Sequence, residues 1–341
     1  HLLYLIFIEG KFIKIVYLFM NLLIPKNKTG DYIYTYLDYF IQLKRFPVLG
    51  TFNYFIINQK LNSKNFKLKE QTTDKYLSKE FLRKIKLNKY IVPTIFYNNS
   101  VDKLINTIFQ KKHLRILTKE NTNSVIIKPT NSQGRKIIKK IKLGVSLKNV
   151  LNKEELNKLK QWQGENYYIA SRDKCYKDLS PGFIVEPLID NDNNIRDYKF
   201  HIKSSKVKVV QVDSDRFKDH YRNLYNSKFE KLNFSICYKS KNIKIFKPKK
   251  FNEIKRVASK IGKYFNYCRV DLYIKKSPND LIISNKKTSY KNQVIIDGVL
   301  MTDLDTDEGG DFLDEGFSFT EDGSMTDPMF SFKFTDINLS E

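Results

Sequence analysis

Apolar side chains recur at helical spacing in several stretches of the chain, which predicts amphipathic helices there. Residues 74–86 show the pattern most clearly, because Tyr76, Phe81 and Ile85 share one helical face and Asp74 can cap the first turn. The same spacing predicts a helix within 31–62 that is followed by a turn at Pro47, and further helices over 101–110, 152–161 and 251–264.

Short runs rich in β-branched and aromatic residues predict strands between these helices. Residues 124–128 and 136–141 flank a polar loop that contains Gly134, so they are expected to form a β-hairpin with a small tip. Further strands are predicted over 90–97, 182–189 and 268–274 and, as a pair, between 195 and 213. This order of hairpin, helices and strands predicts the α+β class with mostly antiparallel sheet.

Residues 2–24 are strongly apolar, but Glu9, Lys11 and Lys14 interrupt them near the middle. A membrane-spanning helix needs about 20 mostly apolar residues, and charges near its centre are costly. A secretory signal peptide would need a small-residue cleavage site, which the segment lacks. The segment is therefore expected not to cross a membrane. An amphipathic helix on a membrane surface and a buried helix or strand pair are both open.

Charge divides the chain into a basic body and an acidic tail. The formal net charge is +24, but residues 297–341 hold 13 acidic side chains and one basic one, Lys333, which leaves a net +36 on residues 1–296. A basic body suits nucleotides, acidic glycans, nucleic acids or an anionic membrane surface. Compositional drift in a Lys- and Asn-rich sequence explains the charge equally well. No RNP-like, helix-turn-helix or zinc-finger pattern supports nucleic acid as the partner.

Cysteine and histidine usage excludes two further classes of protein. Cys175, Cys237 and Cys268 lie far apart without a CxxC pair, which excludes a disulfide scaffold or zinc ribbon and fits a reducing cytoplasm. The four histidines form neither HxH nor HExxH, so they do not indicate a metal site.

Four charged residues interrupt the predicted strands and mark candidate chemistry. Lys128 ends the first strand of the hairpin, Glu186 lies in an otherwise apolar strand, and Lys199 and Asp271 interrupt two others. A glycine-tipped hairpin can close over phosphates, a strand lysine can hold a phosphate, and a strand carboxylate can bind ribose hydroxyls or Mg²⁺. Each alone would fit a solvent-facing strand position, but their succession along the chain favours a nucleotide site.

These motifs resemble the ATP-grasp superfamily and, more narrowly, the TupA-like ATP-grasp proteins of cell-surface polysaccharide biosynthesis of the teichuronic-acid type. The resemblance covers about residues 50–274, in the order of the family. The matching stretches are TTDKYLSKEFLRKI (72–85), YIVPTIF (90–96), SVIIKPTNSQGRKII (124–138), PGFIVEPLI (181–189), IRDYKFHI (195–202), VDSDRF (212–217) and FNYCRVDLYI (265–274).

The resemblance implies ATP and Mg²⁺ as cofactors and assigns the hairpin to the phosphates. Lys128 would contact the ATP phosphates. Asn131, Ser132 and Gly134 would belong to a flap that covers them.

The resemblance also implies a nucleotide-binding role for the strands that follow. Glu186, with its neighbours Val185 and Leu188, would lie at the interdomain hinge around adenine and ribose. Lys199 and Arg216 would line the nucleotide or acyl-phosphate site as catalytic residues.

The metal site is where this chain departs from the family. Arg269 would meet the γ-phosphate and Asp271 a Mg²⁺ ion. The family has a further strand with a Glu in a GE(I/L)TF-like motif, whereas spacing places Asn285 there, followed by two lysines. Asparagine can bind a metal through its carbonyl but brings no charge, and the lysines oppose a cation. Either Mg·ATP binding is impaired, or the sequence beyond about residue 277 is altered, as by a frameshift or a fusion.

An ATP-grasp fold has two α+β subdomains that clamp a nucleotide. The segments expected here are an apolar helical region (1–50), a pre-ATP-grasp region (51–120), the N-subdomain (121–190), the C-subdomain (191–296) and the acidic tail (297–341).

The function that the resemblance implies is ligation. Such enzymes activate a carboxylate as an acyl phosphate, from which an amine or another nucleophile then displaces phosphate. The expected partners are ATP and an acidic small molecule or glycan in the cytoplasm, with membrane-surface contact through residues 2–24 as a further option. Two alternatives are a catalytically impaired ATP-grasp nucleotide-binding or scaffold protein, which Asn285 supports, and a basic nucleic-acid-binding protein. The sequence gives no indication of the oligomeric state.

Overall fold

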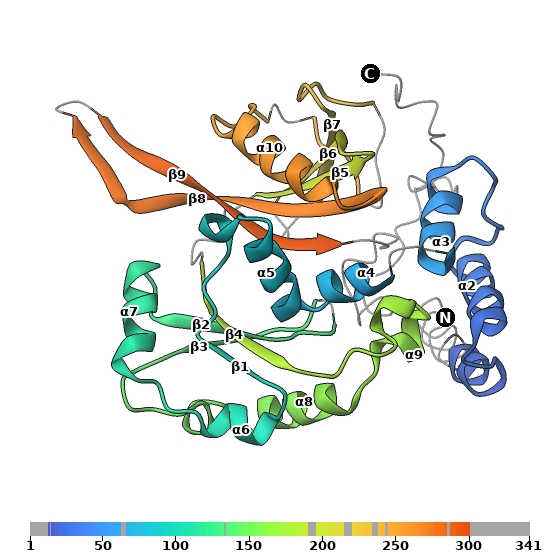
Figure 1. Cartoon of the computed structure of the whole chain (residues 1–341), viewed down its shortest axis with the longest axis horizontal. Coiled ribbons are helices and arrows are strands. Elements are labelled where there is room, and N and C mark those ends of the chain that lie inside the picture. The colour runs from blue at the N-terminus through green and yellow to red at the C-terminus, as the bar shows by residue number, and fades with distance from the viewer. Residues whose placement is uncertain are drawn as a thin grey trace, which may run out of the picture.

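Two antiparallel sheets and the helices around them form the architecture of this computed structural model (Figure 1). The α+β class expected from the sequence is confirmed. The structure describes residues 13, 15–62, 66–132, 134–189, 196–214, 220–233, 238–242, 245–284 and 287–300. The α-helices are α2 (Lys28–Leu43), α3 (Phe52–Asn62), α4 (Phe66–Thr73), α5 (Lys75–Lys84), α6 (Val101–Asn106), α7 (Lys111–Lys119), α8 (Lys153–Gly164), α9 (Tyr167–Ser171) and α10 (Phe251–Gly262). Short 3-10 turns cover Asn88–Tyr90, Leu147–Asn149 and Lys174–Tyr176.

The first sheet has four strands in the order β1-β4-β2-β3. Its central hairpin pairs β2 with β3, and β4 adds on the other side of β2, with Ile126 opposite Glu186 and Lys128 opposite Ile184. One face of this sheet packs into a buried core with α6, α7 and α8, which includes Val125, Ile127 and Val185. The strands are β1 (Phe96–Asn98), β2 (Ser124–Pro129), β3 (Ile137–Lys140) and β4 (Phe183–Pro187).

The second sheet has five strands in the order β7-β6-β5-β8-β9. Helix α10 covers one face, where Phe200, Val210 and Val270 are fully buried beside Ile254 and Ile261. Strands β8 and β9 continue beyond the other strands as a long hairpin that projects from the molecule (Figure 1). The strands are β5 (Asp197–Lys203), β6 (Lys206–Ser214), β7 (Tyr221–Asn226), β8 (Tyr267–Ser284) and β9 (Lys287–Leu300).

Helix α5 connects the two sheets. Asp74 caps it as expected, because its carboxylate accepts from the backbone N–H groups of Tyr76 and Leu77, both at 2.8 Å. Its apolar face, including Phe81 and Leu82, packs in the core of the five-stranded sheet. Its polar face reaches the four-stranded sheet, as described below. The helix therefore contributes to both halves of the structure.

The structure differs from the sequence expectation at several of the predicted strands. Residues 90–97 form a strand only from Phe96, because a 3-10 turn ends at Tyr90 and Pro93 follows it without a backbone N–H to donate. Strand β8 continues past the predicted end at residue 274 to Ser284. Strand β9 contains Asp297, the first residue of the expected acidic tail.

The N-terminal helices are held to the rest of the chain by Arg172, whose side chain is fully buried. Its guanidinium donates to the carbonyl oxygens of Pro25 and Ile24, both at 3.2 Å, and lies 3.8 Å from Asp31. Tyr168 donates to the same carboxylate at 2.7 Å. Within the described residues, no helix is long and apolar enough to cross a membrane. Residues 2–12 and 14 of the apolar N-terminal segment lie outside the described residues.

Candidate functional site

Alternate residues of the five-stranded sheet form a buried, charged face on the side away from α10. Side chains of successive strand residues point to opposite faces, so the residues between the apolar core positions gather on one surface. The pairing of neighbouring strands brings these polar residues side by side. They are Asp197, Lys199, His201, Gln211, Asp213, Arg222, Arg269 and Asp271, each at most 8% exposed.

Asp213 is the centre of this polar face. Arg222 binds it with two hydrogen bonds, from Nε to Oδ1 at 2.7 Å and from Nη2 to Oδ2 at 3.3 Å. The Lys199 ammonium lies 3.0 Å from Oδ2 and 3.8 Å from Asp197. Burial by itself would raise the pKa of Asp213, but the charges of Lys199 and Arg222 outweigh it and hold that pKa well below its usual value. The carboxylate is therefore ionised at neutral pH.

A line of hydrogen bonds extends from Asp213 across the sheet. Gln211 donates from Nε2 to Asp213 Oδ2 at 3.1 Å, and its Oε1 lies 3.2 Å from His201 Nε2. The other ring nitrogen, Nδ1, lies 2.8 Å from the Tyr267 hydroxyl. Because an amide oxygen only accepts, this arrangement assigns the proton of neutral His201 to Nε2.

Arg269 and Asp271 form a second buried ion pair on β8. Arg269 donates from Nε and Nη2 to the two carboxylate oxygens of Asp271 at 3.0 and 3.1 Å. Asp271 also lies opposite Lys199 in the β5–β8 pairing. The structure thus brings together Lys199, Arg269 and Asp271, three of the residues predicted from the sequence.

Glu186 is the centre of the charged cluster on the four-stranded sheet. Its carboxylate accepts a hydrogen bond from Lys79 of α5 and lies 3.2 Å from the ammonium of Lys128 on β2. Lys79 also donates to the carbonyl of Val92 at 2.8 Å and to Thr94 at 3.0 Å. Burial raises the pKa of Glu186, but the two lysines oppose this and lower it to about 2.

Acid is expected to remove the stabilisation that these carboxylates provide. The pKa of Glu186 and that of Asp213 are lowered in the folded chain, so the unfolded chain takes up protons first as the pH falls. Their contribution is complete above about pH 4.5 and is lost progressively towards pH 2; for Glu186 it is on the order of 3 kcal/mol. Urea denaturation at pH 6, 4 and 3 measures how far the free energy of unfolding falls with pH. In Glu186→Gln this fall should be smaller than in the wild type. An equal fall in the variant and the wild type would contradict a stabilising role for the ionised Glu186 carboxylate.

The loop after β2 is anchored by Lys75, the first residue of α5. Its ammonium donates to the carbonyl oxygens of Pro129, at 2.9 Å, and Ser132, and its backbone N–H donates to that of Thr130 at 3.0 Å. Asn131 and Ser132 of the predicted flap are buried. The hydroxyls of Thr130 and Ser132 have no hydrogen-bond partner in the described part of the chain. Buried hydroxyls of this kind can donate to a phosphate oxygen.

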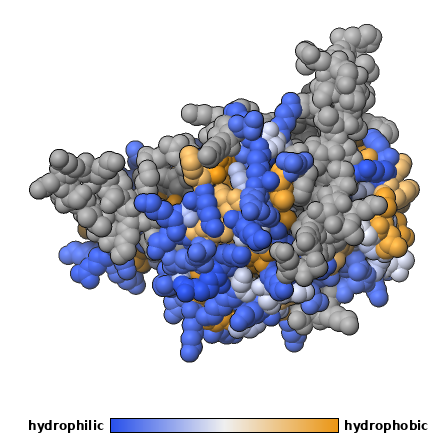
Figure 2. Space-filling view, turned by 90° about the horizontal axis from the view of Figure 1, so that it is seen from above, coloured by the Kyte–Doolittle hydropathy of each residue, from blue (hydrophilic) through white to orange (hydrophobic). Residues whose placement is uncertain are grey.

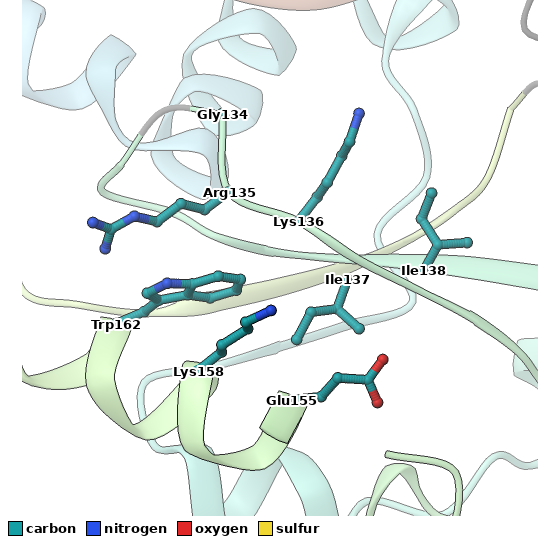
Figure 3. A pocket seen from close by; sticks show the side chains of 8 residues that line it. All are labelled: Gly134, Arg135, Lys136, Ile137, Ile138, Glu155, Lys158 and Trp162. Atoms are coloured by element: carbon teal, nitrogen blue, oxygen red, sulfur yellow. The ribbon is translucent and has the colours of Figure 1, made fainter. Parts of the chain in front are cut away.

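The far end of this loop lies beside a cavity of about 400 Å³ between β3 and α8 (Figure 3). Gly134 has a φ of +68°, a left-handed conformation that suits glycine, and it lines the cavity with Arg135. Arg135 pairs with Glu165, and its guanidinium carbon lies 5.9 Å from the centre of the Trp162 ring. Neither Lys128 nor Glu186 lines this cavity, so it is separate from the charged cluster on the sheet.

The pairing of β8 with β9 brings Asp297 next to Asp271. Gly298 is the partner of Asp271 and Ile296 that of Leu272, so Asp297 is the extra residue at a register shift. At the projecting tip of the β8–β9 hairpin, far from Asp271, Ser284 pairs with Lys287 (Figure 1).

Asn285 and Arg216, the remaining predicted site residues, lie outside the described residues. No group of three or more metal-binding side chains is present in the part of the chain whose side chains are described.

Val185 and Leu188 differ from Glu186 in their surroundings. The Val185 side chain is fully buried in the core with α6 and α8, on the opposite face from Glu186. Leu188 is half-buried after the end of β4, where its N–H donates to Ser124 at 2.9 Å.

Sequence reasoning missed Lys79, Asp213 and Arg222 as members of this site. Lys79 was detectable, because it lies in the stretch TTDKYLSKEFLRKI, which was used for its helix periodicity and for the family resemblance but not for its charges. Arg222 was not detectable, because strand β7 was not predicted.

Comparison with known proteins gives one family. The model of a family described as TupA-like ATPgrasp matches residues 55–285. No curated protein matches the chain.

Several solved structures are similar at low identity. The ATP-grasp ligase PsnB complexed with minimal precursor is 12% identical, with a TM-score of 0.34, over 72% of this chain and 55% of that one. D-alanine–D-alanine ligase from Bacillus anthracis complexed with ATP is 13% identical, with a TM-score of 0.33, over 68% of this chain and 55% of that one. An L-amino acid ligase from Bacillus licheniformis is 9% identical, with a TM-score of 0.36, over 68% of this chain and 43% of that one. The chain thus spans about half the length of the solved structures it matches.

Proposed function

The chain belongs to the TupA-like ATP-grasp family, and from this premise we propose that it is an ATP-dependent ligase that activates a carboxylate as an acyl phosphate. The observation that carries the proposal is the pair of buried charged clusters, one on each sheet. Helix α5 contributes Lys79 to the first cluster and packs into the apolar core of the second sheet. Buried charges of both signs are costly in a stable core and are typical of sites where ionic ligands bind. Apart from β1 and the last residues of β9, the strands of the two sheets fall within the proposed N-subdomain (121–190) and C-subdomain (191–296).

The residues around Lys128 fit the phosphates of ATP. Lys128 and Lys79 provide two cations beside one carboxylate, and Thr130 and Ser132 provide buried hydroxyls that lack partners in the described chain. Lys75 holds the loop that carries these hydroxyls, so it acts as a positioning residue. ATP supplies the phosphoryl group that converts a carboxylate into an acyl phosphate. The lysines would neutralise charge on it, and the loop would exclude water.

The polar face of the five-stranded sheet fits the metal and the reacting carboxylate. Asp271 is a carboxylate ligand suited to Mg²⁺, and Asp297 provides a second carboxyl residue at the neighbouring position of β9. We assign the second metal ligand to Asp297 in place of Asn285. Arg269, Lys199 and Arg216 are the basic residues proposed to orient phosphoryl and carboxylate groups.

The substrate class we propose is an acidic small molecule or glycan of surface polysaccharide assembly in the cytoplasm. Its support is the net charge of +36 on residues 1–296, which attracts anions, together with the teichuronic-acid type of biosynthesis that the resemblance implies. A catalytically impaired nucleotide-binding protein is the second candidate. Its support is the ion pair of Arg269 with Asp271, which would compete with a metal for the same carboxylate.

Calorimetric titration with Mg·ATP tests the proposal. We expect binding by the wild-type chain and at least about tenfold weaker binding by Lys128→Ala, since a hydrogen bond to a charged group contributes about 1.5–3 kcal/mol. Lys119→Ala, a lysine at the end of α7, is the matched control and should bind as the wild type does. Folded wild-type protein that binds no Mg·ATP would contradict both the ligase and the nucleotide-binding proposals. Binding without turnover would leave the impaired candidate.

A further inference from the structure

An entirely apolar stripe covers the exposed face of the helix formed by residues 15–23. Its members, at helical spacing, are Ile15, Leu18, Phe19, Leu22 and Leu23. Leu22 and Leu23 are 71% and 77% exposed. The opposite face is the one that packs, because Met20 is buried there and Tyr17 donates to Asp38 of α2 at 2.6 Å. The outward-facing apolar residues therefore leave about half or more of their surface exposed.

The neighbouring helix and loop add more exposed apolar surface. Ile33, Leu37 and Phe40 lie on one exposed face of α2. The loop after α2 exposes Phe46, which stacks on Phe40, together with Val48 and Leu49. Figure 2 shows apolar residues gathered at the right-hand end of the molecule, the end where α2 and α3 lie in Figure 1. Apolar surface of this extent on a protein marks a binding surface.

The charges around this surface are basic. Lys26, Lys28, Lys44 and Arg45 are all exposed between residues 24 and 50. The acidic residues in the same stretch are Asp31 and Asp38, of which Asp31 is buried beside Arg172 and Asp38 accepts from Tyr17. Every exposed ionic group of the stretch is therefore cationic.

We propose that this surface, formed by residues 15–49, binds the interface of an anionic lipid bilayer, with the helix lying flat on it. Leucine and phenylalanine on one side and lysine or arginine beside them are the composition of helices that insert between headgroups without crossing the membrane. The flanking cations attract anionic headgroups. They also repel the same cations on a second copy of this chain, which disfavours dimerisation through this surface. The proposal is independent of the ligase function, because none of these residues belongs to the charged clusters.

Co-flotation of the full chain with vesicles tests this proposal. Vesicles of phosphatidylcholine with one quarter phosphatidylglycerol should bind the wild type, and salt should weaken that binding. Leu22→Ser with Leu23→Ser should weaken it by about tenfold or more, since each exposed leucine loses its transfer into the interface. Lys26→Gln with Lys28→Gln should weaken binding to anionic vesicles by about thirtyfold, which corresponds to roughly 1 kcal/mol for each of the two charges.

The control replaces exposed apolar residues elsewhere. Leu143→Ser with Phe246→Ser removes side chains that are 51% and 72% exposed and should leave vesicle binding unchanged. A Phe19→Trp variant should show a blue-shifted emission on anionic vesicles if the stripe enters the interface. Vesicle binding that is equal in the leucine variant and the control would overturn the proposal. A concentration-dependent dimer that the leucine variant abolishes, without vesicle binding, would also overturn it and assign the surface to a second copy.

Discussion

Replacing Asp213 with asparagine is expected to lower the free energy of unfolding by about 3–5 kcal/mol, the usual cost of breaking a buried ion pair by removing one partner. The substitution keeps the size of the side chain but removes the charge that compensates Arg222 and Lys199, both of which are at most 1% exposed. Their mutual repulsion and lost hydration then act against folding. Chemical denaturation at neutral pH, with circular dichroism as the readout, measures the change.

Two further variants make this result specific. Glu80→Gln removes the carboxylate of the exposed pair with Arg83 and should cost less than about 1 kcal/mol. The double variant Asp213→Asn with Arg222→Met should recover part of the stability, because the uncompensated cation is removed as well. A loss below about 1 kcal/mol in Asp213→Asn would show that the cluster does not stabilise the fold.

Replacing Asp297 with asparagine is expected to lower turnover of ATP by about a hundredfold or more, whereas Asn285→Ala should leave it within about twofold. The reason is charge: Asp297 occupies the register position beside Asp271 in the β8–β9 pairing, and a carboxylate is a stronger Mg²⁺ ligand than the uncharged amide of Asn285. Release of ADP, followed at increasing Mg²⁺ concentration, is the measurement. If the loss lies in metal binding, high Mg²⁺ should recover part of the activity of Asp297→Asn.

The opposite order of effects would return the metal site to Asn285. Asp297→Asn should also fold as stably as the wild type within about 1 kcal/mol, so a large loss of stability would mean that the residue has a structural role instead. Since this experiment presupposes a working enzyme, it follows the Mg·ATP titration.

The sequence predicted most of the helices and strands because their periodicity is strong. The capped helix α5, the hairpin β2–β3 and the paired strands β5 and β6 lie within a few residues of the expected bounds. Helix α7 was missed, although it spans Lys111–Lys119, because charged residues dominate it. The long extension of β8 was missed for the same reason, since residues 275–293 are rich in lysine and asparagine.

The candidate site was harder to predict, because it depends on which strands are neighbours. Lys199 and Asp271 were recognised singly, but their pairing across β5 and β8 is a property of the sheet. Asp297 was assigned to the acidic tail by net charge, which separated it from the strand that carries it. Asn285 was selected by spacing along the chain, and the structure shows that the β8–β9 pairing continues to Ser284 and Lys287 on either side of it. Asn285 itself lies outside the described residues, so its place in the metal site stays a prediction.

The position of α5 has a consequence for how the protein unfolds. Phe81 and Leu82 complete the core of one sheet, while Lys79 compensates Glu186 on the other. If either half were to unfold alone, the remaining half would expose apolar surface or retain a buried carboxylate without one of its two cations. Partial unfolding is therefore unfavourable for both halves, and we expect the two sheets to lose structure in one cooperative transition.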